Sequence, residues 1–271
     1  MSGKKESNSR EKPLYKRSSW EVQKSVIHAL FLREVNVRFS AGKLGYFWVI
    51  FEPLMQIFIF VMVKVLLFGN NSNFDYHVFI TLGFIGYNLF RHVIDRSLNA
   101  FSANKGLYAY KQVRPIDALI ARLLIEVLIT VIIAIIFIFV GLYLDLNMSP
   151  KNLGMVIFSY LWLITFAFSL GLFIAVVGLF FDSFKKVVKI LLSPLMFISA
   201  IFYSMQDLPQ AVQALLYYNP VVHFMEMLHG YYFFVLNDDF VDYQYIAIWT
   251  VVPMYLGLLL YRKLEKGIIS I

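Results

Sequence analysis

The chain has 271 residues, of which 60 % are hydrophobic and only 15 % are charged, and its mean hydropathy is +0.70. Because ordinary soluble domains are roughly 45 to 50 % apolar and about 25 % charged, this composition excludes a water-soluble globule, and zero cysteines exclude disulfides, Cys-ligated zinc and iron–sulfur clusters. A bilayer crossing uses roughly 20 apolar residues, so about six crossings consume the length and leave no room for a soluble catalytic domain.

Apolar segments of helical length follow one another along the chain and predict an all-α membrane protein with six transmembrane helices. The first 19 residues are polar and basic where a signal peptide needs an apolar stretch, so we expect the N-terminus to stay in the cytosol. Residues 1–17 are assigned to a polar, basic cytosolic tail, and residues 18–271 to one transmembrane domain. The expected spans are residues 46–68, 78–90 with a helical continuation to 100, 118–143, 153–181, 187–203 and 245–261.

The 24 Lys and Arg residues indicate the orientation of these spans. Apart from Lys64 in the first span and Lys151 in the loop after the third, all fall in residues 1–45, residues 91–122, residues 185–189 around the start of the fifth span, and the C-terminal tail. Cationic loops stay in the cytoplasm, so both termini of this multi-pass protein are expected there. The pI near 9.4 is thus a signal of topology, whereas a nucleic-acid partner would need cations and aromatics clustered on one soluble face.

Two cytosolic segments do not have the pattern of spans. Residues 18–40 open with a capping box of Ser18 and Glu21, and their imperfect amphipathic pattern predicts a helix along the membrane surface or in contact with a partner. Residues 101–117 are too polar for lipid and rich in Lys, Arg and Tyr. They are a candidate docking element, and a solvated loop with interfacial tyrosines is the alternative.

The outer loop, residues 204–244, contains no Lys or Arg, yet its residues 208–236 are apolar enough for a membrane and are broken by Pro209, Pro220 and Gly230. One extra crossing would move the cationic C-terminal tail outside. Two short re-entrant helices, which enter and leave on the same side, add no crossing and keep the C-terminal tail inside. Such helices are tolerated where they are buried in protein or line a watery cavity. We therefore expect an outer gate here, with a cap of interfacial helices as the alternative.

Motifs of nucleotide and hydrolytic chemistry are missing from the sequence. It contains no Gly-x-x-x-x-Gly-Lys-Ser/Thr loop, no Gly-x-Ser-x-Gly elbow and no His-Glu-x-x-His motif. His223, Glu226 and His229 recur at intervals of three and share one broad helical face. Hydrogen bonding inside a packed helix is favoured there over a metal site, which would need further ligands. We expect no catalytic residue, metal or cofactor in this chain.

Charged residues within spans are costly and therefore mark functional candidates. Glu52 lies near the inner end of the first span, where a cation of the inner surface is its expected partner. Arg91 with Asp95, and Arg122 with Glu126, are i to i+4 pairs, so each pair is expected to compensate its own charges. These carboxylates do not form the buried chain of a proton relay, which weakens the case for a proton-coupled carrier.

Aromatic residues make up 18 % of the chain, more than two interfacial belts require. Flat apolar rings can stack on sugars along a continuous path, although packing in the core or against lipid is the alternative for each ring. The candidate channel residues are Phe47, Trp48, Phe51, Phe58, Phe197 and Tyr203. The candidate outer-gate residues are Tyr217, Tyr218, Asn219, Pro220, His223 and Glu226.

Several short strings, in order from about residue 20 to the C-terminus, resemble the membrane subunit of ABC-2 type capsular polysaccharide exporters. They are EVQK at 21–24, ALFLRE at 29–34, LGYFW at 44–48 with Glu52-Pro53, NKGLY at 104–108, PID at 115–117 and NPVVH at 219–223. The likeness is strongest to the permease of the Gram-negative group 2 capsule system, and O-antigen and teichoic acid permeases are nearer cousins than drug exporters.

This resemblance implies a homodimer in the bacterial inner membrane, a channel between the two copies, and two copies of a cytosolic ABC ATPase that use ATP and Mg. It also implies a periplasmic adaptor, an outer-membrane channel, and a polysaccharide cargo with or without a lipid terminus. The family's interfacial helix, coupling helix and outer gate map to residues 18–40, 101–117 and 208–236. The implied ATPase contacts are Lys105, Gly106, Leu107, Tyr108, Tyr110, Arg114 and Asp117.

Other functions stay open at this point. Within transport, the cargo is alternatively an O-antigen or teichoic acid type polymer. In a different class, a polytopic membrane enzyme acting on lipid-linked sugars would use His223, Glu226 and His229, but the nucleotide-sugar domain and the paired carboxylates of such an enzyme are missing.

Overall fold

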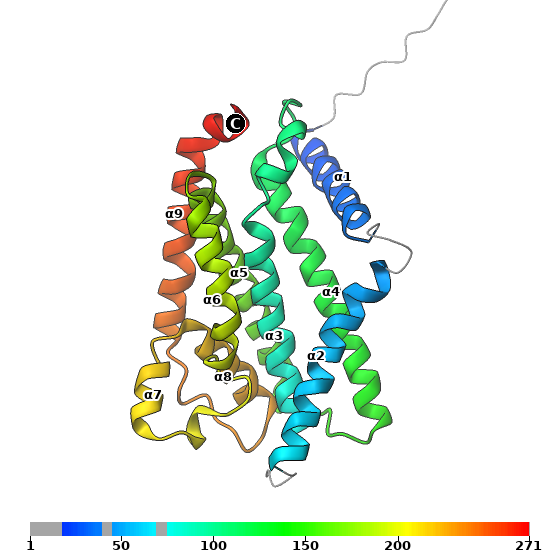
Figure 1. The fold of residues 1–271 in the computed structure, drawn as a ribbon, viewed down its shortest axis with the longest axis vertical. Helices are drawn as coiled ribbons and strands as arrows, with labels where there is room; N and C mark the ends of the chain where they lie inside the picture. The colour runs from blue at the N-terminus through cyan, green and yellow to red at the C-terminus, as the bar shows by residue number, and fades with distance from the viewer. Residues whose placement is uncertain (1–17, 40–44, 69–74, 271) are drawn as a thin grey trace, which may run out of the picture.

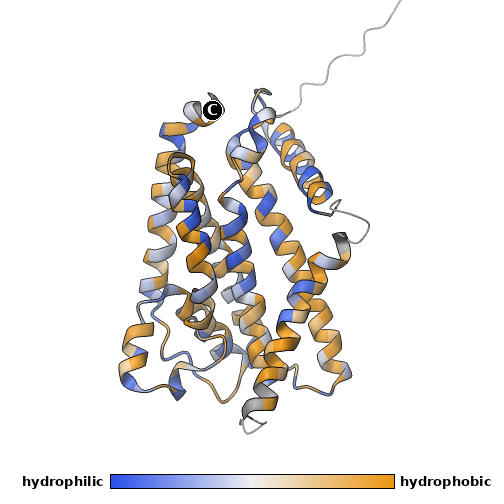
Figure 2. Cartoon of the chain, in the orientation of Figure 1, coloured by the Kyte–Doolittle hydropathy of each residue, from blue (hydrophilic) through white to orange (hydrophobic). Residues whose placement is uncertain are grey.

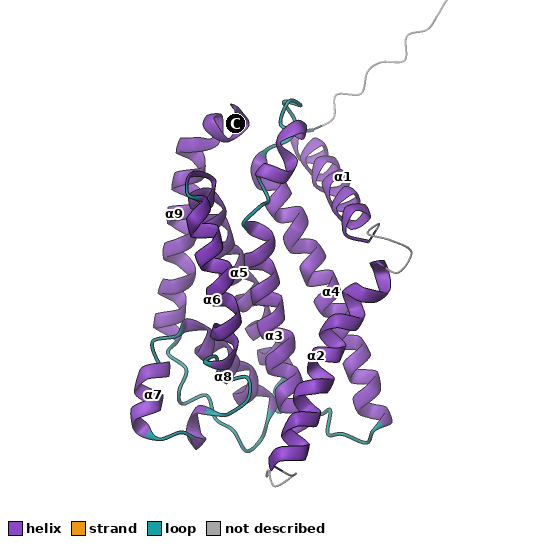
Figure 3. Ribbon diagram, viewed as in Figure 1, coloured by secondary structure: helices purple, strands orange, loops and turns teal. Residues whose placement is uncertain are grey.

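The computed structural model describes residues 18–39, 45–68 and 75–270, and the described part of the chain is helical and contains no strand (Figure 3). The all-α prediction is thereby confirmed, whereas the basic tail predicted at 1–17 lies outside the described residues. The elements are α1 Ser19–Phe39, α2 Gly45–Phe68, α3 Tyr76–Ser97, η1 Ser102–Leu107, α4 Pro115–Tyr143, α5 Leu153–Phe180, α6 Asp182–Phe197, η2 Met205–Asp207, α7 Gln210–Leu216, α8 Pro220–Tyr232 and α9 Tyr243–Ser270.

The long helices run up and down one bundle, and the turns between them fall at two opposite ends (Figure 1). The start of α1, η1 and the end of α9 lie at one end, and α7 and α8 lie at the other. We call the first the basic end, because it carries the exposed cations Lys105, Lys111, Arg114, Lys186, Arg262 and Lys263. We call the second the acidic end, because it carries Asp75, Asp145, Asp207, Asp238, Asp239 and Asp242.

Helix α3 is the centre of the bundle, since every residue from 78 to 90 is buried. It packs against α2, α4, α5 and α8. Glycine allows the closest of these approaches: a Cβ added at Gly86 would lie 3.0 Å from Leu228 Cδ1 of α8. Gly257 does the same for α9, where an added Cβ would lie 3.1 Å from the backbone nitrogen of Phe173 in α5. Small residues thus let α8 and α9 pack tightly on the central helices.

Three described helices are long and apolar enough to cross a membrane, namely Pro115–Tyr143, Leu153–Phe180 and Tyr243–Glu265, and Phe47–Val63 is a shorter apolar helix. The other two predicted spans correspond to α3 and α6. Hydrophilic residues interrupt the parts of α3 and α6 nearest the basic end (Figure 2). Those hydrophilic residues lower the hydropathy of α3, and α6 is in addition only 16 residues long, so neither helix is among the long apolar ones.

The fifth predicted span, 187–203, is placed differently from the helix that forms. Helix α6 begins at Asp182 and ends at Phe197, six residues before the predicted end. The chain then turns sharply through Ala200, whose φ of 55° lies in the left-handed region. Apolar composition continues through this turn, in which residues 199–201 are buried in the protein, so the hydropathy pattern did not reveal the end of the helix.

Helix α1 packs along α4, with Leu30 buried between them. Polar contacts fix this position: Arg122 Nε lies 3.0 Å from Glu34 Oε1, and Arg33 Nη1 donates a hydrogen bond of 2.7 Å to Asn104 Oδ1 of η1. The predicted helix therefore forms over Ser19–Phe39, and the charged residues Arg33 and Glu34, which interrupt its amphipathic pattern, contact η1 and α4.

Candidate functional site

A pocket of about 430 Å³ lies between α1, α2, α3 and α6 toward the basic end, and we call it the charged pocket. Several charged residues converge on it from helices that are distant in sequence. Its lining is Arg38, Trp48, Val49, Glu52, Pro53, Arg91, His92, Asp95, Arg96, Lys189 and Leu192. The pocket thus joins Trp48, a predicted channel residue, to Glu52, Arg91 and Asp95, which were predicted as intramembrane charges.

Helical spacing explains how the sequence builds this pocket. Positions 91, 92, 95 and 96 follow the i, i+1, i+4, i+5 pattern that places side chains on one face of α3. Trp48 and Glu52 are likewise one turn apart on α2, next to Pro53. The facing helices then bring Arg38 and Lys189 to the same place. The sequence analysis did not single out these two cations, because only packing brings α1 and α6 beside α2.

The predicted pairing of charges within helices is wrong for α3. Asp95 Oδ1 lies 3.3 Å from Lys189 Nζ of α6, so its partner is not Arg91. Within the described part of the chain, Glu52 and Arg91 have no ion-pair partner within 4 Å. Because Glu52 and Arg91 face the pocket without an ion-pair partner, the pocket favours water or a ligand that is charged and polar.

The same prediction is wrong for α4. Arg122 pairs with Glu34 of α1, and Glu126 accepts a hydrogen bond from Arg38 of α1. Glu126 is only 2 % exposed, and burial makes the compensation of its charge necessary. The reason for the error is that α1 packs along this face of α4 and supplies its own charges.

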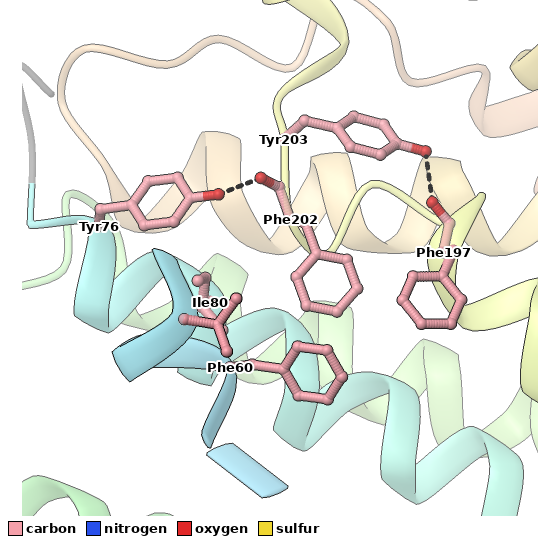
Figure 4. A pocket seen from close by; sticks show the side chains of 7 residues that line it. Phe60, Tyr76, Ile80, Phe197, Phe202 and Tyr203 are labelled. Carbon is pink, nitrogen blue, oxygen red and sulfur yellow. Dashed lines mark hydrogen bonds between the residues drawn. The ribbon is translucent and has the colours of Figure 1, made fainter. Parts of the chain in front are cut away.

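A second pocket, of about 400 Å³, lies toward the acidic end and is apolar (Figure 4). We call it the aromatic pocket, and it is lined by Phe60, Val63, Tyr76, Ile80, Phe197, Phe202 and Tyr203. Two hydroxyl groups fix the turn after α6 on one side of it: Tyr203 Oη donates a hydrogen bond of 3.0 Å to Phe197 O, and Tyr76 Oη donates to Phe202 O.

The predicted channel aromatics separate into groups. Phe197 and Tyr203 line the aromatic pocket and Trp48 lines the charged pocket. Phe47 stacks on Phe51 with ring centroids 4.6 Å apart near the start of α2. Phe58 is 55 % exposed on α2 and lines neither pocket. Phe60, two positions along the helix, reaches the aromatic pocket instead, because it lies on the face of α2 that packs against α3.

The predicted coupling loop divides into an exposed surface and a buried support. Lys105, Gly106, Tyr110 and Arg114 are exposed at the basic end, and Leu107 is half-buried. A groove of about 420 Å³ lies between α1 and three residues of this loop, Leu107, Gln112 and Val113. The exposed residues form a surface that a partner protein can reach.

Two residues of the predicted coupling set do not belong to this surface. Tyr108 is 4 % exposed and packs with Phe101, Leu119 and Tyr261. Asp117 is fully buried: it caps α4 by accepting a hydrogen bond of 2.9 Å from Arg114 N, and it accepts another from Gln23 of α1. Both therefore support the loop from inside and cannot contact a partner, which corrects the sequence-based expectation.

The segment at the acidic end forms two short helices, α7 and α8, separated by residues 217–219. Asn219 caps α8 by accepting a hydrogen bond of 3.0 Å from Val221 N. Its side-chain amide donates a hydrogen bond of 2.9 Å to Ile198 O. Pro220 follows at the first position of α8, where its missing N–H costs nothing. The hydrogen bond from Asn219 to Ile198 ties the start of α8 to the turn after α6. Tyr217 and Tyr218 are exposed beside the break between the two helices.

The side chains His223, Glu226 and His229 are buried on α8, and each has a separate partner. His223 Nε2 donates a hydrogen bond of 2.8 Å to Tyr217 O, while Nδ1 accepts one of 3.1 Å from Asp242 N. Glu226 Oε1 accepts a hydrogen bond of 2.9 Å from Met205 N, and His229 Nε2 donates a hydrogen bond of 3.1 Å to Phe79 O. The described residues contain no group of three such ligands that could hold a metal ion.

Outside the helices, Asp238 at the acidic end accepts hydrogen bonds from Tyr243 Oη at 2.6 Å and Tyr231 Oη at 3.1 Å. These hydroxyl donors, Tyr243 first, hold the pKa of the Asp238 carboxyl below its usual value. Lys151 of this end donates a hydrogen bond of 3.5 Å to the nearby carbonyl of Leu236. The cluster fastens the loop before α9 to the end of α8.

Known proteins are similar to this chain over nearly its full length. Residues 25–233 match the ABC-2 type transporter family. The chain is 34 % identical over 264 residues to the polysialic acid transport protein KpsM of Escherichia coli, covering 94 % of this chain and 99 % of that one. It is 29 % identical to the capsule polysaccharide export inner-membrane protein BexB of Haemophilus influenzae, covering 93 % and 96 %. It is also 29 % identical to the corresponding protein CtrC of Neisseria meningitidis serogroup B, covering 95 % and 98 %.

Proposed function

Because this chain belongs to the ABC-2 type transporter family, we propose that it is the permease subunit of an ATP-driven exporter that moves capsular polysaccharide out of the cytoplasm. The observation that carries the proposal is the nearly full-length similarity to permeases named for polysialic acid transport and capsule polysaccharide export. The charged pocket supports it, because cations beside Trp48 can bind the anionic groups of an acidic sugar while the ring stacks on its apolar face.

In this proposal the protein lies in the bacterial inner membrane, crosses it six times, and has the basic end in the cytoplasm. The cations of the basic end support this orientation. Cargo enters at the charged pocket and leaves past the aromatic pocket and the α7–α8 segment, which acts as the outer gate. A polymer in transit needs many weak contacts, and the two pockets offer them in succession along α2 and α3.

The channel is completed by a second copy of the chain. Apolar residues of α2 and α6 are exposed beside the pockets, among them Phe58, Met62, Ile190 and Leu191. In a membrane, exposed apolar side chains face either lipid or another protein, and lipid cannot seal the open side of a charged pocket, whereas a second protein copy can. We therefore place the homodimer contact on α2 and α6, with the charged pockets of both copies facing one path.

The driving force comes from two copies of a separate cytosolic ABC ATPase that bind ATP and Mg. This chain has no phosphate-binding loop, so energy must arrive through a surface contact. Lys105, Tyr110 and Arg114 supply that contact, and Tyr108 and Asp117 hold it in place from behind. A periplasmic adaptor and an outer-membrane channel continue the path for a polymer with or without a lipid terminus.

The alternative of an enzyme acting on lipid-linked sugars is not favoured. Its candidate residues His223, Glu226 and His229 on α8 are at most 2 % exposed, so a substrate cannot reach them, and each of them hydrogen-bonds to the protein's own backbone. They therefore cannot perform acid–base chemistry on a substrate in this arrangement.

Deleting the protein from its native cell tests the proposal. Polysaccharide should accumulate in the cytoplasm while synthesis continues, and Tyr203→Ala should slow export while the complex with the ATPase still assembles. Normal surface capsule in the deletion strain, with no duplicate exporter present, would refute the cargo assignment.

A further inference from the structure

Behind the wall of the charged pocket, one buried carboxylate faces three basic side chains. Glu126 of α4 accepts a hydrogen bond from Arg38 Nη1 of α1. Its oxygens also lie 3.7 Å from His92 Nδ1 and 3.7 Å from Arg96 Nε, both on α3. Arg38, His92 and Arg96 all line the charged pocket, but Glu126 does not. Glu126 is therefore the common support of basic groups that reach the pocket from two different helices.

From this geometry we propose that Glu126 is a positioning residue for cargo recognition: it holds Arg38, His92 and Arg96 in the arrangement that binds the anionic groups of an acidic polysaccharide. The inference rests on the proposed function, because it assumes that the charged pocket receives the cargo.

Burial supports a positioning role. The Glu126 side chain is 2 % exposed and the Arg38 side chain 11 % exposed, so neither can exchange its partner for bulk water. The Arg96 side chain is 45 % exposed and keeps room for an external anion while it leans on the carboxylate. A guanidinium has five N–H donors, so Arg38 and Arg96 can bind Glu126 with some donors and a cargo anion with others.

Charge and geometry make opposite predictions for the loss of this carboxylate. Glu126→Gln adds one unit of positive charge around the pocket, so Coulomb attraction by itself predicts tighter binding of an anion. If Glu126 positions the wall, the same substitution lets Arg38 and Arg96 separate by mutual repulsion, and binding becomes weaker. The sign of the change therefore distinguishes a positioning residue from a simple counter-charge.

Glu34 provides a matched control. Glu34→Gln also adds one unit of positive charge and also removes an ion pair between α1 and α4, the contact of 3.0 Å with Arg122. Arg122 does not line the charged pocket. An effect that comes only from loosening α1, or only from added charge, must therefore appear in both variants.

The experiment uses the full chain assembled with its ATPase in lipid nanodiscs and measures equilibrium binding of fluorescent oligosialic acid, with neutral oligodextran as the comparison. We expect Glu126→Gln to weaken oligosialic acid binding about tenfold and Glu34→Gln to change it less than twofold. Oligodextran binding should be the same in all variants. Glu126→Asp keeps the charge but shortens the side chain, and it should weaken oligosialic acid binding about threefold.

Unchanged or tighter oligosialic acid binding by Glu126→Gln would overturn the inference, as would equal losses in the two Gln variants or equal losses for the two probes. If Glu126→Gln does not fold, Glu126→Asp decides, and wild-type affinity in that variant would overturn the inference. A wild type that binds no oligosialic acid would instead refute the cargo pocket of the proposed function, an outcome that is separate from any effect of the variants.

Discussion

Replacing Tyr108 by Ala should destabilise the protein, whereas the same change at Tyr110 should leave stability unchanged. The two tyrosines lie in one loop and are separated by one residue, and sequence-based reasoning gives them the same role. In the structure Tyr108 is 4 % exposed and Tyr110 is 66 % exposed. Stability measurements on this pair therefore test directly whether the loop has an inner and an outer face.

The expected magnitude follows from burial. An aromatic side chain buries roughly 150 to 250 Å², which at about 25 cal/mol per Å² corresponds to about 4 to 6 kcal/mol of transfer free energy. Because Ala retains the Cβ, and because large-to-small changes of buried aromatics cost about 3 to 5 kcal/mol, we expect Tyr108→Ala to lower the free energy of unfolding by about 4 kcal/mol. Tyr110→Ala should change it by less than about 0.5 kcal/mol.

A third variant isolates the hydroxyl group. Among the described residues, Tyr108 Oη has no hydrogen-bond partner although it is buried. An unsatisfied buried hydroxyl costs about 1 to 3 kcal/mol, so Tyr108→Phe should raise the free energy of unfolding by about 1 kcal/mol.

The assay is unfolding of the purified permease in detergent, followed by circular dichroism for all three variants under one condition. ATP hydrolysis and export by the assembled transporter are measured in parallel. Tyr110→Ala should uncouple ATP hydrolysis from export at wild-type stability. Wild-type stability of Tyr108→Ala, or a strong loss in Tyr108→Phe, would refute the assignment of this side chain to the buried support.

Arg114→Glu should reverse the charge of the docking surface and reduce ATPase binding about tenfold or more in co-purification, while membrane insertion stays normal; full export by this variant would contradict the docking surface. Single cysteines at Asp207 and Lys263 should label from outside only at Asp207, and outside labelling at Lys263 would reverse the proposed orientation. Because hydrogen bonds from Tyr243 lower the pKa of Asp238 in the folded state, this group stabilises the fold above its unfolded pKa of about 3.9, and that contribution is lost as pH falls through the lower folded pKa. Asp238→Asn should therefore show a smaller loss of stability than wild type below about pH 4, and parallel pH profiles would contradict this linkage.

Much of the local structure follows from the sequence because it depends on neighbouring residues. The capping box of Ser18 and Glu21 begins α1. Glu21 N donates a hydrogen bond of 3.2 Å to Ser18 Oγ, and Ser18 N donates one of 2.9 Å to Glu21 Oε2. Asn219 and Pro220 separate α7 from α8 as their cap preferences predict. Long apolar runs likewise predict α4, α5 and α9, since hydropathy and length are properties of a single segment.

The same local reasoning fails where a residue's role depends on which helix becomes its neighbour. The sequence predicted pairing of Arg122 with Glu126 from their spacing, but α1 packs alongside and pairs with both. It placed Tyr108 on a docking surface, yet the loop folds this ring inward against Tyr261, more than 150 positions away.

The sequence by itself thus determined the all-helical class of the protein and the capped helices, because composition, periodicity and caps act within one segment. Only the tertiary structure decided the partners of the buried charges and the two pockets along α2 and α3. The physical reason is that a buried charge takes its partner from whichever helix packs nearest. Spacing along one helix does not carry that information, so Lys189 and Arg38 reach the charged pocket through packing alone.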